Sequence, residues 1–150
     1  MGHVSWQDAT FDSYPNAPFD PAFLPLSGVV DLSGGRMQNT PEYETALTAI
    51  YDIQLANGAT LVPSLTWAYT DDQFLRIYAR PDIDLEEGYH KLDGNVRYTS
   101  ADSKWYVEGF VQNLTDEFAR QAAFQSGFLS YNAIYVERRV WGFRAGYNFY

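Results

Sequence analysis

Carboxylates gather in one short stretch of the chain, where Asp82, Asp84, Glu86 and Glu87 follow one another at close spacing. Several carboxylate oxygens together can bind a hard cation such as Ca²⁺. A calcium loop of the EF-hand type also needs a turn glycine and a distal bidentate glutamate, and this spacing does not provide them. We therefore interpret the run as a solvated acidic loop.

A second pair of carboxylates, Asp116 and Glu117, ends the segment Asn113-Leu114-Thr115-Asp116-Glu117. Adjacent side chains on a strand or helix point in different directions, so this pair is poorly arranged for acid–base catalysis. The triplet that begins at Asn113 has the form of a glycosylation acceptor. Asparagine and threonine side chains also bond nearby backbone groups in turns, and we favour that interpretation here.

The chain has two histidines, His3 and His90. A metal site would need partner ligands, and the spacing of the sequence does not supply them. His90 falls near one end of a predicted strand, on its apolar side, where we expect an interfacial position.

Three arginines near the end of the sequence, Arg138, Arg139 and Arg144, can bind an anionic ligand or a lipopolysaccharide phosphate. For Arg144 we expect an ion pair with a carboxylate on the polar side of the strands. The candidate partners are Asp52, Asp93 and Glu108.

Composition narrows the classes of function further. The 150 residues carry a formal net charge of −9, which argues against nucleic-acid binding, since phosphate contacts need clustered lysine and arginine. The absence of cysteine excludes disulfides and thiolate chemistry. No serine–histidine–acid set and no glycine-rich phosphate loop occurs, so we predict no enzyme, no cofactor and no metal. The substrate-binding residues stay unassigned.

Alternation of apolar and polar residues predicts six strands. It is clearest at the end of the sequence, where Trp141, Phe143, Ala145, Tyr147 and Phe149 occupy every second position. The predicted strands cover residues 3–13, 42–55, 59–70, 87–98, 105–112 and 135–150. Within the third strand a proline, residue 63, predicts a bulge or local distortion, because proline donates no ladder hydrogen bond.

The predicted connections alternate between long and short. Residues 14–40, 71–86 and 113–134 form long connections, and we expect a helical turn capped by Thr115 in the last of them. Asn57-Gly58 and residues 99–104 form tight turns. Transmembrane barrels have short turns on one side of the membrane and long loops on the other, so this pattern favours membrane strands with the long loops outside the cell.

The alternation also predicts two faces for these strands. The lipid-facing side comprises Leu61, Leu65, Trp67, Leu92, Val96, Val107, Phe143 and Tyr147. The opposite, lumen-facing side comprises Thr48, Asp52, Thr66, Asp93, Asn95, Arg97, Glu108, Arg144 and Asn148.

Three motifs, in order, resemble those of TonB-dependent outer-membrane receptors. The segment from Asp31 to Arg36, with Asn39-Thr40-Pro41-Glu42-Tyr43 after it, is similar to a "DLsG.r.pnaPe" segment. Trp105 followed by Phe110-Val111-Gln112-Asn113-Leu114-Thr115-Asp116-Glu117 is similar to "W…fv.NLtDe". The segment from Gly142 to Phe149 is similar to the closing strand of that family. Tyr150 departs from the pattern, in which the aromatic at the position of Phe149 is usually terminal.

The resemblance implies that residues 1–150 are the C-terminal part of a 22-stranded outer-membrane β-barrel, an antiparallel meander of about six transmembrane strands. It implies uptake of a scarce ligand such as a ferric siderophore, cobalamin or an oligosaccharide. The implied partners are outer-membrane lipid and lipopolysaccharide, an N-terminal plug with the other barrel strands, and the TonB complex through that plug. The sequence has no match to the plug, the TonB-contacting box or a signal peptide, so we expect uptake to need more than this chain.

Two alternatives remain open. One is a small complete outer-membrane barrel with a structural or adhesive role, for which eight strands are the usual minimum. The other is a soluble β-sandwich that binds carbohydrate through its aromatic residues, which would place Trp67, Trp141, Phe143 and Tyr147 against a second sheet.

Overall fold

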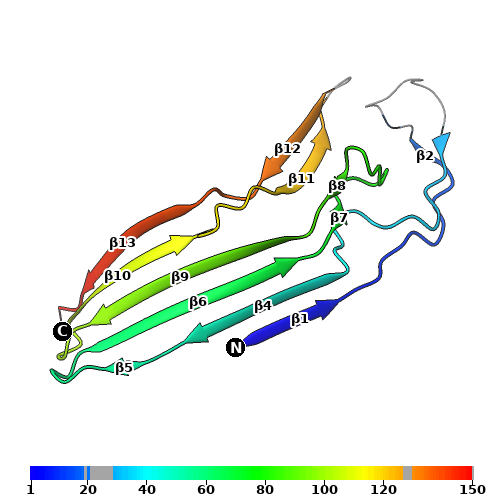
Figure 1. The fold of residues 1–150 in the computed structure, drawn as a ribbon. Helices are drawn as coiled ribbons and strands as arrows, with labels where there is room; N and C mark the ends of the chain where they lie inside the picture. The colour runs from blue at the N-terminus through cyan, green and yellow to red at the C-terminus, as the bar shows by residue number, and fades with distance from the viewer. Residues whose placement is uncertain (19, 21–28, 127–129, 150) are drawn as a thin grey trace.

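The chain folds into strands arranged mainly in one antiparallel sheet. The computed structural model describes residues 1–18, 20, 29–126 and 130–149, and these residues contain no helix. The sheet runs in chain order through β1 (Gly2–Trp6), β4 (Tyr43–Ile50), β6 (Thr60–Thr70), β9 (Tyr89–Thr99), β10 (Trp105–Gln112) and β13 (Val140–Tyr147), with the short β5 (Ile53–Gln54) also paired to β6 (Figure 1). The predictions of an all-β fold and of antiparallel pairing between consecutive strands are confirmed.

Three small hairpins lie in the long connections. They pair β2 (Ala17–Pro18) with β3 (Val29–Val30), β7 (Gln73–Phe74) with β8 (Leu85–Glu86), and β11 (Arg120–Gln125) with β12 (Tyr131–Tyr135). The described residues of all three connections lie at one end of the sheet, and the tight turns lie at the other (Figure 1). The predicted separation of long and short connections is therefore confirmed; we call these ends the loop end and the turn end.

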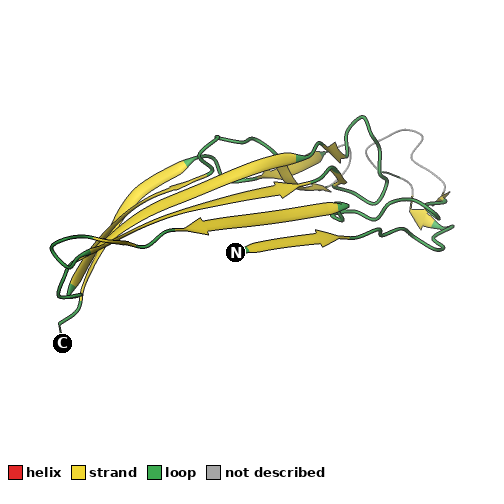
Figure 2. Cartoon of the chain, turned by 60° about the horizontal axis from the view of Figure 1, so that its bottom comes forward, coloured by secondary structure: helices red, strands yellow, loops and turns green. Residues whose placement is uncertain are grey.

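The sheet is open. Strands β1 and β13 are its two edges and do not pair with each other. The sheet curves along its length as a single layer (Figure 2). The described residues include no helix with the length and hydropathy needed to cross a membrane.

The register places the predicted residues on two faces. Opposed residues in an antiparallel pair project from the same side, so the rows Leu47–Trp67–Leu92 and Tyr98–Val107–Ala145 belong to one face. All eight residues predicted for the apolar face share it. Residues of the polar face that lie within strands are also confirmed: Thr48, Thr66, Asp93, Asn95, Arg97, Glu108 and Arg144. Asp52 and Asn148 lie just outside the strands, where register does not assign a face.

Neither face of the sheet is covered by a second layer in the described part of the chain. The buried hydrophobic residues there are Ala17, Ala59, Leu75, Ala119 and Val136, none of which belongs to the six long strands. Large apolar side chains on the strands are exposed instead, with Phe143 at 76% and Trp141 at 71%. The sheet thus lacks the buried layer that stabilises a soluble sandwich.

Several predicted boundaries were wrong. The first strand ends at Trp6, not at residue 13, because residues 7–14 turn to pair loosely with residues 32–37 through an isolated bridge between Thr10 and Arg36. The last strand begins at Val140, since Tyr135 already belongs to the β11–β12 hairpin. The helical turn expected at Thr115 is a tight turn closed by a bond from the Asp116 amide to the Asn113 carbonyl. Tyr150 lies outside the described residues.

The predicted distortion at Pro63 appears on the partner strand. β6 runs through the proline unbroken, whereas the opposing segment is interrupted at Tyr51 and Asp52 between β4 and β5. The Tyr51 amide donates to the Pro63 carbonyl at 3.1 Å, but Pro63 has no N–H to return the second bond of this pair. Pairing resumes in the same register at Ile53, so no residue is added and both faces are preserved.

Glycines on β13 make room for aromatic rings of β10 on the polar face. A Cβ at Gly146 would lie 2.3 Å from Cε1 of Tyr106, and one at Gly142 would lie 2.9 Å from Cζ of Phe110. Each ring therefore lies over a glycine of the neighbouring strand. Each ring also lies beside a guanidinium. The Cζ atom of Arg97 lies 3.7 Å from the centroid of the Tyr106 ring, and that of Arg144 lies 4.6 Å from the centroid of the Phe110 ring.

We predict that Gly146→Val weakens the β10–β13 pairing, because the new side chain collides with the Tyr106 ring. The cost should be about 1–3 kcal/mol, as for overpacking elsewhere. Urea unfolding of the chain in detergent micelles measures it. In the Tyr106→Ala background the same change should cost much less, and an equal cost in both backgrounds would show that the ring–glycine contact is not the cause.

Candidate functional site

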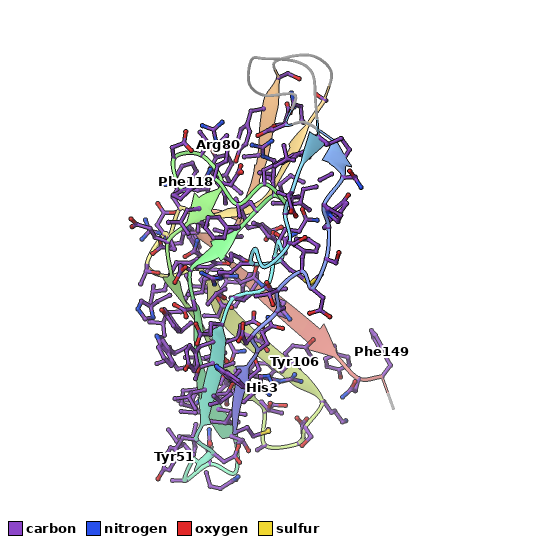
Figure 3. All side chains as sticks on the ribbon, turned by 90° about the vertical axis from the view of Figure 1, so that its right-hand side faces the viewer. His3, Tyr51, Arg80, Tyr106, Phe118 and Phe149 are labelled. Carbon is purple, nitrogen blue, oxygen red and sulfur yellow. The ribbon has the colours of Figure 1, made fainter. Side chains whose placement is uncertain are left out.

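The three long connections meet at the loop end, and ion pairs join them. Arg36 of the first connection bonds Asp72 of the second at 2.9 Å. The amide of Asn39 donates to the carbonyl of Phe74 at 2.8 Å, which ties the same two connections through their backbones. Figure 3 shows Arg80 of the second connection and Phe118 of the third in this region. We call this assembly the loop cluster.

Arg76 is the buried centre of the loop cluster. Its guanidinium, 5% exposed, donates to Asp84 at 2.7 Å and to both carboxylate oxygens of Asp20 at 2.9 and 3.2 Å. The rings of Tyr78 and Tyr131 lie 5.4 and 5.3 Å from its central carbon. One side chain thus joins residues from all three connections. Two carboxylates and two ring faces offset the cost of burying its charge.

Arg120 makes a second junction between the second and third connections. It pairs with Glu86 at 2.5 Å and also donates to the carbonyls of Ile83 and Leu85. The hydroxyl of Tyr131 donates to the same Ile83 carbonyl at 3.0 Å. The β11–β12 hairpin is therefore fixed against residues 83–86 by several directed bonds.

The acidic run is not a cation site among the described residues. Asp82 pairs with Arg80, Asp84 with Arg76 and Glu86 with Arg120, so each carboxylate serves a different arginine. Glu87 is exposed. No group of metal-binding side chains is found in the described chain. The interpretation of the run as solvated was wrong for Asp84, which is 0% exposed, because a buried guanidinium compensates its charge.

The NLTDE segment forms a fixed elbow between β10 and the β11–β12 hairpin. Asn113, 1% exposed, donates from its side chain to the carbonyls of Glu117 and Glu137, both at 2.9 Å. Its side-chain oxygen accepts from the amide of Glu117, and its own amide donates to Asp93. The φ of Asn113 is 51°, in the left-handed region that asparagine tolerates. The interpretation as a turn is confirmed for Asn113, whose side-chain amide bonds three backbone groups, whereas the Thr115 hydroxyl bonds the Asn113 side-chain oxygen at 3.5 Å.

Asp116 links the elbow to the start of β13. Its carboxylate accepts from the amide of Arg139 at 3.0 Å and pairs with Arg138 at 2.8 Å. The backbone bond from Arg139, with the two positive charges, lowers the pKa of Asp116 below its usual value. Asp116 therefore accepts hydrogen bonds that join the elbow to the segment just before β13.

The polar face of the sheet carries a row of charges in its middle. Glu108, nearly buried, lies opposite Arg97 on β9 and Arg144 on β13. Arg144 pairs with it at 3.3 Å, so of the candidate partners named from the sequence, Glu108 is the one that the structure selects. Asp93, by contrast, accepts the Asn113 amide. Arg138 and Arg139 lie at the elbow, away from this row.

The two histidines lie on opposite faces of the sheet. His3 is exposed on β1, on the polar face. His90 lies on the apolar face at the loop end, opposite Tyr69, and packs against the rings of Tyr69 and Trp67 at 4.8 and 5.6 Å. The expected position of His90 at a strand end is confirmed.

The sequence did not single out Arg76 or Arg120, which organise the loop cluster. A signal was present: Arg76 and Arg80 stand shortly before the carboxylates of the acidic run. Spacing along one connection, however, does not reveal partners such as Asp20 and Tyr131 that lie in the other connections. Comparison of the chain with protein-family models, curated proteins and solved structures finds no match.

We predict that Arg76→Met loosens the whole loop cluster, because it leaves Asp84 buried without its counter-charge. Loss of one partner from a buried ion pair costs about 3–5 kcal/mol. Hydrogen exchange in detergent micelles should quicken in residues 71–86 and 120–125 together and stay slow in β6 and β9. Arg80→Met, which removes a more exposed pair, is the matched control, with an expected change of about 0–1 kcal/mol. Equal effects of the two variants would contradict the central role of Arg76.

We also predict that Asn113→Asp destabilises the elbow, because the new carboxylate cannot donate to the carbonyls of Glu117 and Glu137. Leaving buried carbonyls without a donor costs about 1–3 kcal/mol. Urea unfolding in micelles measures the change. Thr115→Ala, whose hydroxyl lies at 3.5 Å from Asn113, should be near neutral. A neutral Asn113→Asp variant would rule out this role for the amide.

Proposed function

We propose that this chain forms C-terminal transmembrane strands of a TonB-dependent receptor in the bacterial outer membrane. In this proposal the apolar face contacts lipid, the polar face lines the barrel interior, and the loop cluster faces outside the cell. The role is transport of a scarce ligand, such as a ferric siderophore, cobalamin or an oligosaccharide, and not catalysis. The observation that carries the proposal is an apolar strand face left uncovered by the described chain.

The distribution of side chains on the apolar face supports a membrane location. Aliphatic residues such as Leu65, Val96 and Val111 lie in the middle rows of the sheet, where Trp141 and Phe143 of the edge strand β13 also lie. The other aromatic residues within the strands of this face lie toward the ends: Trp6, Tyr43, Trp67 and Tyr69 toward the loop end, and Tyr98, Trp105 and Tyr147 toward the turn end. Outer-membrane strands have such an apolar band between two aromatic girdles.

Strand lengths are compatible with crossing a bilayer. β6 and β9 each contain 11 residues, which at about 3.3 Å per residue extend roughly 36 Å. A tilt of about 45° reduces this to roughly 25 Å, the height of the apolar band in outer-membrane barrels.

The positions of the strand arginines support the same orientation. Arg97 and Arg144 both lie beside Glu108 on the polar face, so neither side chain projects from the apolar face. An arginine on the lipid side at the bilayer centre would cost about 2–4 kcal/mol. On the lumen side it keeps contact with water and with a carboxylate.

The open edges of the sheet explain why the proposal assigns these strands to a larger barrel. Unpaired backbone groups in a bilayer cost several kcal/mol each, so both β1 and β13 need neighbours. The proposed neighbours are the other strands of a barrel of the 22-stranded type. The proposed uptake also needs a plug, which would contact the TonB complex.

The alternatives make different use of the same sheet. A soluble carbohydrate-binding sandwich would need a second sheet over Trp67, Trp141 and Phe143, and the described residues contain none. A small complete barrel would need the β1 and β13 edges to pair, and they are separate. These observations favour the receptor proposal over both.

We predict that the purified chain needs detergent or lipid to stay dispersed, because its apolar face and open edges otherwise associate. Cells that contain this chain alone should take up no ligand. Sedimentation with and without detergent, followed by urea unfolding, tests the first point. A soluble monomer that unfolds in one cooperative transition without detergent would refute the receptor proposal and favour the soluble sandwich.

A further inference from the structure

The turn that joins β5 to β6 contains the only asparagine of the chain that is followed by glycine, Asn57. Asn57 and Gly58 are both exposed. Asparagine is a chemically labile residue, because the backbone nitrogen of the next residue can attack the carbon of its side-chain amide. Glycine hinders that attack least, since it has no Cβ and its backbone adopts the widest range of conformations. Asn57 is therefore the asparagine with the most reactive neighbour.

Three hydrogen bonds restrain this turn. The Gly58 amide donates to the Leu55 carbonyl at 2.9 Å, and the Leu55 amide donates to the Ala59 carbonyl at 2.8 Å. The Ala59 amide donates to Oδ1 of Asn57 at 3.1 Å. The first of these bonds withholds the proton that the Gly58 nitrogen must lose, and the last fixes the side chain that it must attack. The reaction therefore requires the turn to open.

The gap at Pro63 leaves the turn weakly anchored to the rest of the sheet. β5 pairs with β6 through two residues, and among the described strands it pairs with no other. Toward β4 the ladder is interrupted at Tyr51 and Asp52, opposite a proline that has no N–H to donate. Few bonds must break to free residues 53–59, so this segment can open locally while β4, β6 and β9 stay paired.

We propose that Asn57 is a site of spontaneous deamidation, and that local opening of this turn sets its rate. In the open turn the Gly58 nitrogen loses its proton and bonds to Cγ of Asn57. The side-chain nitrogen takes up a proton and leaves as ammonia, and a cyclic succinimide remains. Water then adds to either carbonyl of the ring and opens it to aspartate or isoaspartate. The inference goes beyond the proposed function and does not depend on it.

Either product changes the turn. The new carboxylate adds one negative charge and takes the formal net charge from −9 to −10. Isoaspartate also lengthens the backbone by one methylene group, so the bonds between Leu55 and Ala59 lose their geometry. Ala59, which is 0% exposed, then loses its packing. We therefore expect the modified turn to stay open more of the time than the original one.

The test incubates the full chain in detergent micelles at mildly alkaline pH and locates the conversion by peptide mass spectrometry. Asn57 should convert faster than Asn95 and Asn132, which lie within strand ladders. Pro63→Val restores the missing donor and should slow the conversion about fivefold, the effect of one net hydrogen bond that holds the segment closed. Leu65→Val changes the same face of β6 without adding a donor and is the matched control. Unfolding in urea should speed the conversion, because it removes the restraint of the turn.

Each outcome bears on the proposal. Conversion of Asn57 no faster than that of Asn95 and Asn132 in the folded chain would overturn the site. Equal rates in the folded and the urea-unfolded chain would overturn the restraint by the turn. Equal rates in the original chain and Pro63→Val would overturn the role of the gap. If Pro63→Val does not fold, amide hydrogen exchange of the original chain decides: exchange as slow in residues 53–59 as in β9 would contradict local opening.

Discussion

An apolar sheet face without a covering layer is the constraint on which the structure depends. A soluble domain of 150 residues stabilises itself by burying such a face, yet the large apolar side chains of these strands stay exposed. Backbone hydrogen bonds between neighbouring strands are satisfied, so the sheet has regular geometry without a core. The apolar face of the sheet therefore needs an apolar environment, and the polar face does not. The proposed bilayer location would meet that demand, with the polar face turned toward water.

The two ends of the sheet differ in the length of their connections and in the contacts that hold these connections. At the turn end the strands are joined by tight turns, one of which is closed by a bond from the Gly58 amide to the Leu55 carbonyl, with Gly58 at a φ of 83°. At the loop end Arg76 and Arg120 hold three long connections in one assembly through buried or half-buried ion pairs. These networks add to the few buried apolar residues of the connections, such as Leu75. In the proposed receptor, the loop cluster is the part that would form the outer surface for the ligand.

Much of the sheet could be predicted from the sequence because register depends on a period of two. Once Trp67 and Phe143 are assigned to one side, the alternation places Arg97 and Arg144 on the other, and the pairing confirms this. Contacts between connections have no such period. Asp20 and Tyr131 meet Arg76 across long separations in sequence, so neither the burial of Asp84 nor the loop cluster could be predicted. The ends of β1 and β13 were misjudged for the same reason, since loop contacts decide where they stop.

The central claim is that one face of the sheet contacts lipid and the other contacts water. The absence of cysteine allows single cysteines to be placed and spin-labelled without background reaction. Labels at successive positions of β9 from Leu92 to Arg97, in lipid vesicles, should alternate with a period of two. We expect collision with lipid-dissolved oxygen to be high at Leu92, Gly94 and Val96, and collision with a water-soluble reagent to be high at Asp93, Asn95 and Arg97. Equal exposure of all these positions to the water-soluble reagent would contradict the account.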